Sequence, residues 1–482
     1  MRRSLCAAMP ALALALFACG PSSGDGGDGG GGRDGGDPPM VPDACRPGAV
    51  EPCYHGPSGT QDVGPCRAGQ RTCGDDGRWG ACTGQVVPAA EICGNGVDDN
   101  CSGEVDEDID LDHDGFSTCG GDCCDALAAC SAPVLVNPGA FDAPGNGIDD
   151  DCDGQVDNTI ALCDSGLRSS SADAMDYAKA IELCQIATEQ DRRWGVISAK
   201  LTLVDGTGAP AAPSRSIRPG FGTGVTPRGG ASFIELSTGH AADTNDQDPA
   251  YMGFDLGAAM DTFSGYPADW LMRNNGRLPN APNCPGPDGN QANDPVMLTL
   301  RIRVPTNAKS FQLSSNFFSA EYPEYVCSSY NDFYVVLLDS TWTGSPANPA
   351  DKNLATYAAA DGTVYPVGVN LVHGNTGLFR QCRNGRTGCT LGSRRGDSTT
   401  CTAESELAGT GFDEATPGLC NLNSLSGGGT GWLVTTGNVV GGEVITLRVA
   451  IWDTSDENLD SLVIVDNFQW SVTAAQPGTD VP

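Results

Sequence analysis

The sequence predicts a mainly β protein, in which small disulfide-rich, calcium-binding repeat modules with little regular structure precede a jelly-roll-like β-sandwich. Three observations support this fold class. Apolar and polar residues alternate in several segments after residue 194, as in strands with one buried face. The 65 glycines and 32 prolines favour turns over long helices. The 22 cysteines and a dense group of aspartates lie largely where apolar residues are scarce.

Residues 1–18 are predicted to be a lipoprotein signal peptide. Two arginines precede an apolar run, Leu5 to Ala18, which is too short to span a bilayer. The run ends Leu16-Phe17-Ala18-Cys19-Gly20, which resembles the lipobox of bacterial lipoproteins. The resemblance implies cleavage before Cys19 and acylation of that residue, with Gly20 compatible with outer-membrane sorting. An ordinary secretory signal with an incidental cysteine is the alternative.

Residues 19–44 are rich in Gly, Asp and Pro and predict a flexible tether. The chain is therefore expected to be exported and lipid-anchored to the outer membrane or cell surface, with lipid as its only membrane contact. Its net charge of −34 argues against nucleic-acid binding, because no basic patch is available for phosphate. Cations are the expected partners of such a chain.

The cysteines predict a disulfide framework. Cys6 leaves with the signal and Cys19 carries the lipid, so twenty of the 22 remain for up to ten bridges. A zinc or iron–sulfur site is the alternative, but the chain has only four histidines. Residues 45–84 form a Cys-rich module with five cysteines, so one of them is expected to pair outside it, with Cys93 as a near candidate.

Residues 85–158 are acidic repeats and the main candidate metal site. They contain eighteen Asp or Glu and no Lys or Arg, so a compact fold there needs a countercharge such as Ca²⁺ bound by oxygen ligands. Two D-x-D-x-D-G loops occur, and a diluted version with Asn precedes them. The predicted ligands are Asp110, Asp112 and Asp114; Asp149, Asp151, Asp153 and Asp157; and Asp98, Asn100 and Asp106. A solvated acidic linker is the alternative, and Mg²⁺ remains a competitor of calcium.

Two segments in this region are internal repeats, Asn95 to Asp106 and Asn146 to Asp157. Together with Glu91-Ile-Cys-Gly-Asn-Gly-Val-Asp-Asp-Asn-Cys101, they resemble the metal-binding repeats of MopE-type bacterial surface proteins, and more distantly thrombospondin type-3 repeats. The resemblance implies that bound Ca²⁺ and disulfides order an extended chain. Copper binding is not implied, because no residues for it can be matched. Gly121 occupies position twelve after Asp110, so an EF-hand is not expected.

Residues 159–193 are expected to form a helical connector. Ser171 or Asp173 is a possible cap, and Ala178, Ile181 and Cys184 share one helical face, with a Cys163–Cys184 bridge expected. Strands are predicted after residue 194 at 197–204, 296–304, 333–338, 364–369, 444–452 and 462–470.

Residues 194–475 are assigned to the sandwich domain. Six segments resemble, in this order, the choice-of-anchor L domain: Ser319–Val326, Tyr330–Phe333, Asn353–Ala355, Thr430–Leu433, Ile451–Thr454 and Asp460–Phe468. The resemblance covers roughly 194–472 and implies a bacterial surface protein with no established activity.

Four carboxylates flank the predicted strands of this domain: Glu321, Asp332, Asp453 and Asp460. They are a possible second calcium site, because carboxylates at a sandwich edge can bind a structural ion. Ordinary turn and capping roles are the alternative. Tyr322, Tyr325 and Tyr330 are candidates for a sugar-stacking surface, with packing as the competing role.

The functional hypothesis is a non-catalytic, lipid-anchored surface protein with calcium-stabilised repeats, in adhesion or envelope architecture, whose partner is a glycan or an envelope protein. A carbohydrate-binding surface protein is the alternative. A polysaccharide hydrolase using Glu321 and Glu324 ranks lower, since the sequence has no His-Glu-x-x-His motif and only four histidines.

Overall fold

The computed structural model describes residues 45–482 except 109, 127–129, 160, 255–259, 288, 390–395, 417–419, 421–423 and 426. The predicted signal peptide, tether and Cys19 lie outside the described residues. The chain forms two compact units. One comprises the chain up to residue 90 with 98–104, and the other comprises 91–97 with 105–482.

The first unit is held by cross-links around one small sheet. Strands β1 (Val50–Cys53) and β2 (Gly69–Thr72) pair antiparallel. The disulfides Cys45–Cys73 and Cys53–Cys82 close this hairpin, and Cys66 pairs with Cys101. One cysteine of the module thus pairs outside it, as expected, but its partner is Cys101 and not the candidate Cys93, which pairs with Cys119. Disulfides replace the apolar core that this short, polar segment cannot form.

The acidic segment of the second unit has little regular structure, as the sequence predicts. It contains the 3₁₀ turns η1 (Thr118–Gly120) and η2 (Pro133–Leu135). Three disulfides cross-link it: Cys93–Cys119, Cys123–Cys152 and Cys124–Cys130. All twenty cysteines expected to form bridges are paired in ten disulfides.

The connector contains one short helix, α1 (Ala174–Lys179). The Asp173 side chain caps it by accepting a hydrogen bond from the Met175 amide at 3.0 Å. The helix ends before Cys184, yet the expected Cys163–Cys184 bridge forms and Ile181 is fully buried. The helix is thus shorter than the sequence predicts, because it ends at Lys179 and the chain turns at Ala180 before the first strand of the sandwich.

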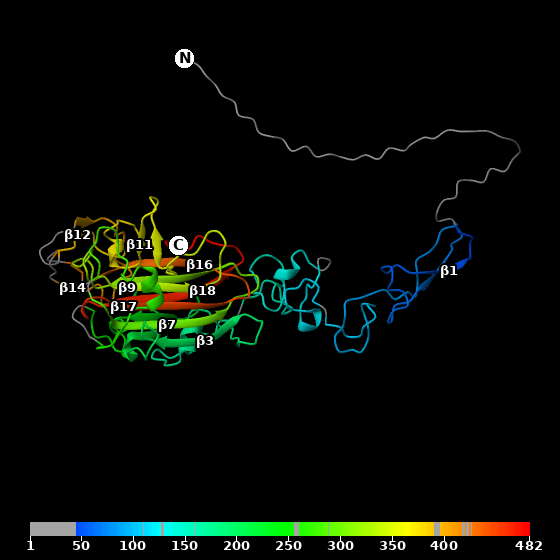
Figure 1. The fold of residues 1–482 in the computed structure, drawn as a ribbon, viewed down its shortest axis with the longest axis horizontal. Helices are drawn as coiled ribbons and strands as arrows, with labels where there is room; N and C mark the ends of the chain where they lie inside the picture. Colours follow the sequence, from blue (N-terminus) through cyan, green and yellow to red (C-terminus); the bar gives the residue numbers. More distant parts are fainter. Residues whose placement is uncertain are drawn as a thin grey trace, which may run out of the picture. The chain divides into compact units, whose positions relative to one another are not determined.

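Two antiparallel sheets form the β-sandwich of the C-terminal domain (Figure 1). The strand order is β19-β16-β8-β18-β5-β4 in one sheet and β3-β7-β17-β9 in the other, where β6 also pairs with β7. The first sheet contains β4 (Arg215–Arg218), β5 (Phe233–Ser237), β8 (Ser310–Ser319), β16 (Gly428–Asn438), β18 (Ser461–Ser471) and β19 (Gly478–Asp480). The second contains β3 (Gly195–Thr202), β6 (Phe263–Ser264), β7 (Ala292–Arg303), β9 (Phe333–Asp339) and β17 (Val444–Asp453).

Short elements lie between these strands. They are the helix α2 (Ala268–Arg273), the 3₁₀ turns η3 (Ala212–Ser214) and η4 (Val369–Leu371), and the pairs β10–β11 (Thr356–Ala358, Val364–Pro366), β12–β13 (Gly385–Thr387, Gly396–Ser398) and β14–β15 (Ala415–Thr416, Ser424–Leu425). Of the predicted strands, 364–369 forms only the short β11, outside both main sheets.

Both sheets are apolar on both faces over part of their length. Along β18, Val463 and Val465 belong to the central core, whereas Leu462 and Ile464 pack in a second cluster with Phe221 and Phe412. The outer face of the second sheet is also covered, because alternate residues of β9 pack against Trp270 of α2 in a third cluster. Loops and short elements therefore cover the outer sheet faces. No helix among the described residues has the length and apolar character needed to cross a membrane.

Candidate metal centres

Backbone amides of the first D-x-D-x-D-G loop hold its carboxylates in place. Asp110 accepts a hydrogen bond from the Gly115 amide at 3.0 Å, and Asp112 accepts one from the Asp114 amide at 3.1 Å. Gly115 has φ +96°, a conformation that L side chains rarely adopt, which lets the loop turn sharply. One oxygen of each carboxylate is thereby fixed by the loop, and the other is left for a ligand.

Two further carboxylates, Asp122 and Asp125, complete this site and are not among the predicted ligands. Oxygens of Asp112, Asp114 and Asp122 lie within 4.8 Å of one another, and so do oxygens of Asp110, Asp112 and Asp125. Asp112 belongs to both groups. We call these five residues the acidic loop site. Asp122 stands one position after Gly121, so a count of twelve along the loop misses it.

Three buried oxygens in the acidic loop site have no hydrogen-bond partner: Asp110 Oδ1, Asp112 Oδ2 and Asp122 Oδ2. Asp122 is only 4% exposed, and its other oxygen accepts from the Cys124 amide at 2.8 Å. Buried carboxylate oxygens without partners are costly unless a cation binds them. The three oxygens without a hydrogen-bond partner are therefore available to coordinate a metal ion.

The electrostatics of the site are unfavourable without a cation. Burial, together with the charges of Asp114, Asp112 and Asp125, raises the pKa of Asp122 to about 6, although the Cys124 amide lowers it. Burial also raises the pKa of Asp114. These carboxylates resist ionisation because low-polarity surroundings and neighbouring charges of the same sign disfavour the anion.

The second internal repeat brings Asp149, Asp151 and Asp153 together, with oxygens within 4.8 Å of one another. Asp149 accepts hydrogen bonds from the amides of Asp153 at 3.1 Å and Gly154 at 2.9 Å. Burial, followed by the charge of Asp153, raises the pKa of Asp151 to about 6. The fourth predicted ligand, Asp157, instead accepts from the amides at the start of the repeat, with Asn146 at 2.9 Å.

The first internal repeat follows the same local pattern with fewer carboxylates. Asp98 accepts from the Ser102 and Gly103 amides at 2.9 Å each, and Asn100 accepts from the Ser102 amide at 2.8 Å. Asp106 accepts from the Asn95 amide at 3.0 Å, as Asp157 does from Asn146. Asn100 and Ser102 stand where the second repeat has Asp151 and Asp153, so this loop has two carboxylates fewer at the ligand positions.

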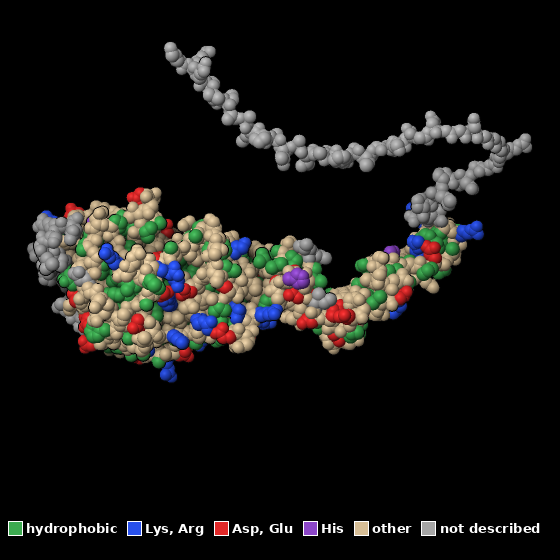
Figure 2. All heavy atoms as spheres, viewed as in Figure 1, with side chains coloured by type: hydrophobic (Ala, Val, Ile, Leu, Met, Phe, Trp, Pro, Cys, Tyr) green, Lys and Arg blue, Asp and Glu red, His purple; other side chains and the backbone are tan. Residues whose placement is uncertain are grey.

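The acidic loop site is joined to the β-sandwich through one buried amide. Asn137 is fully buried and donates to Asp114 Oδ2 at 2.7 Å, while its oxygen accepts from the Thr306 hydroxyl at 2.8 Å. Thr306 lies between β7 and β8. Next to it, Asn307 exchanges two hydrogen bonds with the backbone of Phe141. These hydrogen bonds link the acidic loop site to the loop between β7 and β8 of the β-domain. Figure 2 shows Asp and Glu side chains gathered on the visible face of the acidic segment.

The four carboxylates predicted in the β-domain, Glu321, Asp332, Asp453 and Asp460, are all 1% exposed. Burial, followed by the charges of Asp332, Asp456 and Glu324, raises the pKa of Glu321. Burial also raises the pKa of Asp332 to about 7. Because Glu321 is buried, a hydrolytic pair with Glu324 has no open access to a polysaccharide.

Of the three candidate tyrosines, Tyr322 is 2% exposed and packs against the ring of Phe379. It therefore does not belong to a sugar-stacking surface. Tyr325 and Tyr330 are partly exposed and contact each other edge to face, with ring centroids 5.5 Å apart.

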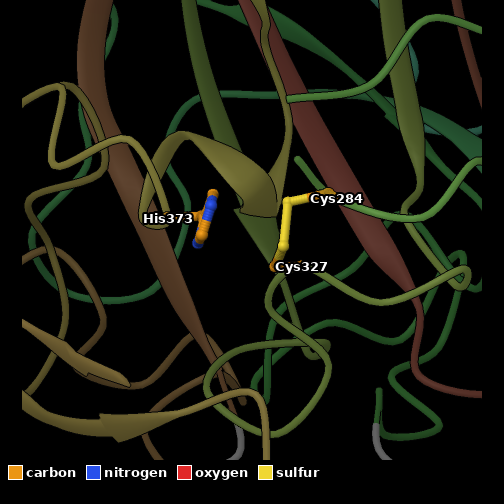
Figure 3. Close-up of side chains that lie close together, drawn as sticks. All are labelled: Cys284, Cys327 and His373. Carbon is orange, nitrogen blue, oxygen red and sulfur yellow. A yellow bond between two sulfur atoms is a disulfide. The ribbon is translucent and has the colours of Figure 1, made fainter. Parts of the chain in front are cut away.

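A fifth group of possible ligands, Cys284, Cys327 and His373, is a disulfide beside a histidine (Figure 3). The cysteine sulfurs bond to each other and are not thiolates, so they are poor metal ligands. The proximity of His373 to this disulfide does not make a zinc site.

Comparisons with known proteins find two families along the chain. The model of the choice-of-anchor L domain matches residues 287–469, a shorter stretch than the 194–472 expected from the sequence. The MopE model, described as "Putative metal-binding motif", matches residues 88–107 and 133–158. The chain thus carries domains of the surface-anchor and metal-binding-motif types. No curated protein and no solved structure matches.

Proposed function

We propose that this chain is an exported, lipid-anchored and non-catalytic surface protein whose acidic repeats are ordered by calcium, and that it serves adhesion or envelope architecture. One observation carries the proposal. The acidic loop site places five carboxylates together with three unpartnered buried oxygens, in a segment that has no Lys or Arg between residues 85 and 158. A bound cation would add countercharge to that of Arg192, whose guanidinium lies beside Gly115.

Calcium fits the chemistry of the site better than magnesium. The available ligands are carboxylate oxygens on an irregular loop, and Ca²⁺ accepts six to eight such ligands at variable angles. Mg²⁺ requires a near-octahedral shell and retains several waters. The second repeat, with Asp149, Asp151 and Asp153, is a further site of the same kind.

The role of the ions in this proposal is mechanical. A Cys19 lipid would anchor the chain, and the disulfide-bonded, calcium-filled segment would hold the β-domain away from the membrane. The contacts from Asp114 through Asn137 to Thr306 support this role, since they join an ion ligand to the loop between β7 and β8. Ion binding would therefore stiffen the connection to the β-domain.

The test is calcium titration of the full chain by calorimetry, with the variants Asp112→Asn and Asp122→Asn. Each removes one charge from the acidic loop site at constant shape. We expect each variant to lose at least one equivalent of bound Ca²⁺, or at least tenfold in affinity at one site. Asp361→Asn is the matched control, because Asp361 lies in an exposed turn between β10 and β11. Unchanged stoichiometry and affinity in both site variants would refute the proposal.

A further inference from the structure

A second group of carboxylates lies at one end of the sandwich, where the two sheets meet. Glu321 follows β8 and Asp460 immediately precedes β18, strands whose residues Ser319 and Ser461 are paired. Asp332 immediately precedes β9 and Asp453 ends β17, strands in which Phe333 pairs with Trp452. Each sheet therefore contributes two carboxylates. We call these four residues the inter-sheet cluster.

The inter-sheet cluster is buried but its oxygens lack partners. Its members are each 1% exposed, and six of their eight oxygens have no hydrogen-bond partner: Glu321 Oε2, both oxygens of Asp332, both of Asp453, and Asp460 Oδ2. The other oxygen of Asp460 faces the Thr238 hydroxyl at the long distance of 3.4 Å. The hydroxyl of Ser461, itself fully buried, also lacks a partner.

Among the residues that the structure describes, no basic side chain is a main electrostatic influence on Glu321 or Asp460. The groups that act electrostatically on Glu321 are the carboxylates of Asp332, Asp456 and Glu324, and those that act on Asp460 are Asp332 and Asp294. Buried charges in proteins are paired or coordinate a metal. Turn and capping roles account for only part of the cluster. The Thr454 amide and the Ser461 hydroxyl lie near Asp332 and lower its pKa, but six of the eight oxygens accept no hydrogen bond of normal geometry.

We propose that the inter-sheet cluster binds one Ca²⁺ ion, with Asp332 and Asp453 as the central ligands and Glu321 and Asp460 beside them. Unlike the acidic loop site, no three of these carboxylates have oxygens that all lie within 4.8 Å of one another. A bound cation would draw the four carboxylates together. A set of ligands made of protein carboxylate oxygens favours Ca²⁺ over Mg²⁺, which keeps several of its waters.

The ion would clip the two sheets together at their shared end. It would join Glu321 and Asp460 of the first sheet's strand ends to Asp332 and Asp453 of the second sheet's strand ends. It would therefore stabilise contacts between segments that are distant in sequence. Gly239 contributes to the site's shape, since a Cβ there would lie 2.2 Å from Asp460 Oδ2. The inference does not depend on metal binding by the acidic repeats.

The test is thermal unfolding of the full chain in Ca²⁺ and in chelator, with Asp332→Asn and Asp453→Asn. If the cluster binds calcium, Ca²⁺ raises the unfolding temperature of the β-domain, and both variants lose that rise. In chelator they should unfold at the same or a higher temperature than the wild type, because each removes an unpaired buried charge. Equal temperature shifts in Ca²⁺ and chelator would show protonated structural carboxyls instead and overturn the proposal.

Two controls separate this site from others. Glu235→Gln removes another fully buried carboxylate of the same domain and should leave the calcium-dependent rise intact. Asp112→Asn alters only the acidic loop site, so it should lower calcium stoichiometry without removing the rise of the β-domain. The two proposals can thus fail independently.

A second measurement covers variants that do not fold. Tb³⁺ replaces Ca²⁺ and emits when a nearby tryptophan is excited, and Trp452 adjoins Asp453 in sequence. We expect Tb³⁺ emission from the wild type that Ca²⁺ competes away. Trp452→Phe should remove that component while the Ca²⁺ stoichiometry stays the same. Emission that is identical in wild type and Trp452→Phe would count against an ion at the inter-sheet cluster.

Discussion

At the scale of single residues, Glu235 shows how this acidic chain tolerates a buried carboxyl group away from any candidate metal centre. It lies on β5, is fully buried, and accepts a hydrogen bond from the Ser216 hydroxyl at 2.8 Å. Burial raises its pKa to about 8, although Ser216 and the charge of Arg218 lower it. The folded protein therefore holds Glu235 in its protonated form at neutral pH.

The pH dependence of stability follows from this shift. Glu235 binds its proton more tightly in the folded state, so its stabilising contribution is full below the ordinary value of 4.5 and is lost as pH rises through about 8. We predict that Glu235→Gln removes this loss. Relative to wild type, the variant should gain up to roughly 1.4 kcal/mol in unfolding free energy per pH unit across that window. Urea unfolding between pH 5 and 9 measures it, with the exposed Glu104→Gln as control; a constant difference across the series would contradict the prediction.

Asp122 shows the limit of counting along a motif. The sequence identifies Asp110, Asp112 and Asp114 by their alternate spacing, and the structure places all three at the acidic loop site. The extra residue before Asp122 is accommodated because Gly121 takes φ +95°. A glycine pair followed by aspartate was the available signal, but its meaning depends on a turn that only the folded loop reveals.

At the scale of elements, helix α2 is held on the second sheet by a network of charges. Arg448 of β17 donates two hydrogen bonds to Asp269, at 2.9 and 2.7 Å, and Lys352 donates to the same carboxylate at 2.9 Å. Hydrogen bonding by Arg448 holds the pKa of Asp269 well below its usual range. Trp270, the next residue, is fully buried against Phe333 and Trp452.

We predict that Asp269→Asn destabilises the protein by about 1 kcal/mol at neutral pH. The estimate is modest because the Asp269 side chain is 36% exposed and Asp339 still pairs with both cations. The depressed pKa means that the stabilisation is present at neutral pH and is lost as pH falls towards that pKa. Denaturant midpoints of Asp269→Asn and of Asp361→Asn provide the comparison. Equal midpoints for the two variants at neutral pH would show that the network contributes nothing.

Sequence periodicity identified the strands now labelled β3, β7, β9, β17 and β18, but not β8 or β16. Strand β8 buries Ser315 and Asn316 completely, and β16 begins with glycines. Both faces of this sheet are covered, one by the central core and the other by the cluster around Phe221. Burial on both faces removes the contrast between an inner and an outer face on which an alternation pattern depends.

At the scale of the whole molecule, the two compact units depend on different interactions. The buried apolar residues of the first unit, among those described, are cysteines: Cys66, Cys73 and Cys101. The β-sandwich instead has a large core of aliphatic and aromatic side chains. Cross-links therefore carry the stability of the first unit, and apolar burial carries that of the sandwich.

We predict that partial reduction unfolds the first unit before the sandwich. Loss of each disulfide should cost about 2–4 kcal/mol, which the first unit cannot replace. Limited proteolysis with mass spectrometry should then show early cleavage between residues 45 and 90, while peptides from β7, β17 and β18 remain protected. Unreduced protein is the control, and early cleavage within those sandwich strands would contradict the prediction.

The sequence by itself determined the mainly β class, the number of cysteines available for disulfides, and the position of the acidic segments. These properties follow from local composition and spacing. Only the tertiary structure decided which cysteine pairs with Cys66, that Asp122 and Asp125 join the acidic loop site, and that six of the eight oxygens of the inter-sheet cluster are buried without a hydrogen-bond partner. The physical reason is that burial and proximity depend on chain segments far apart in sequence. The sequence around a carboxylate at a strand end is the same whether water or a second sheet covers that residue.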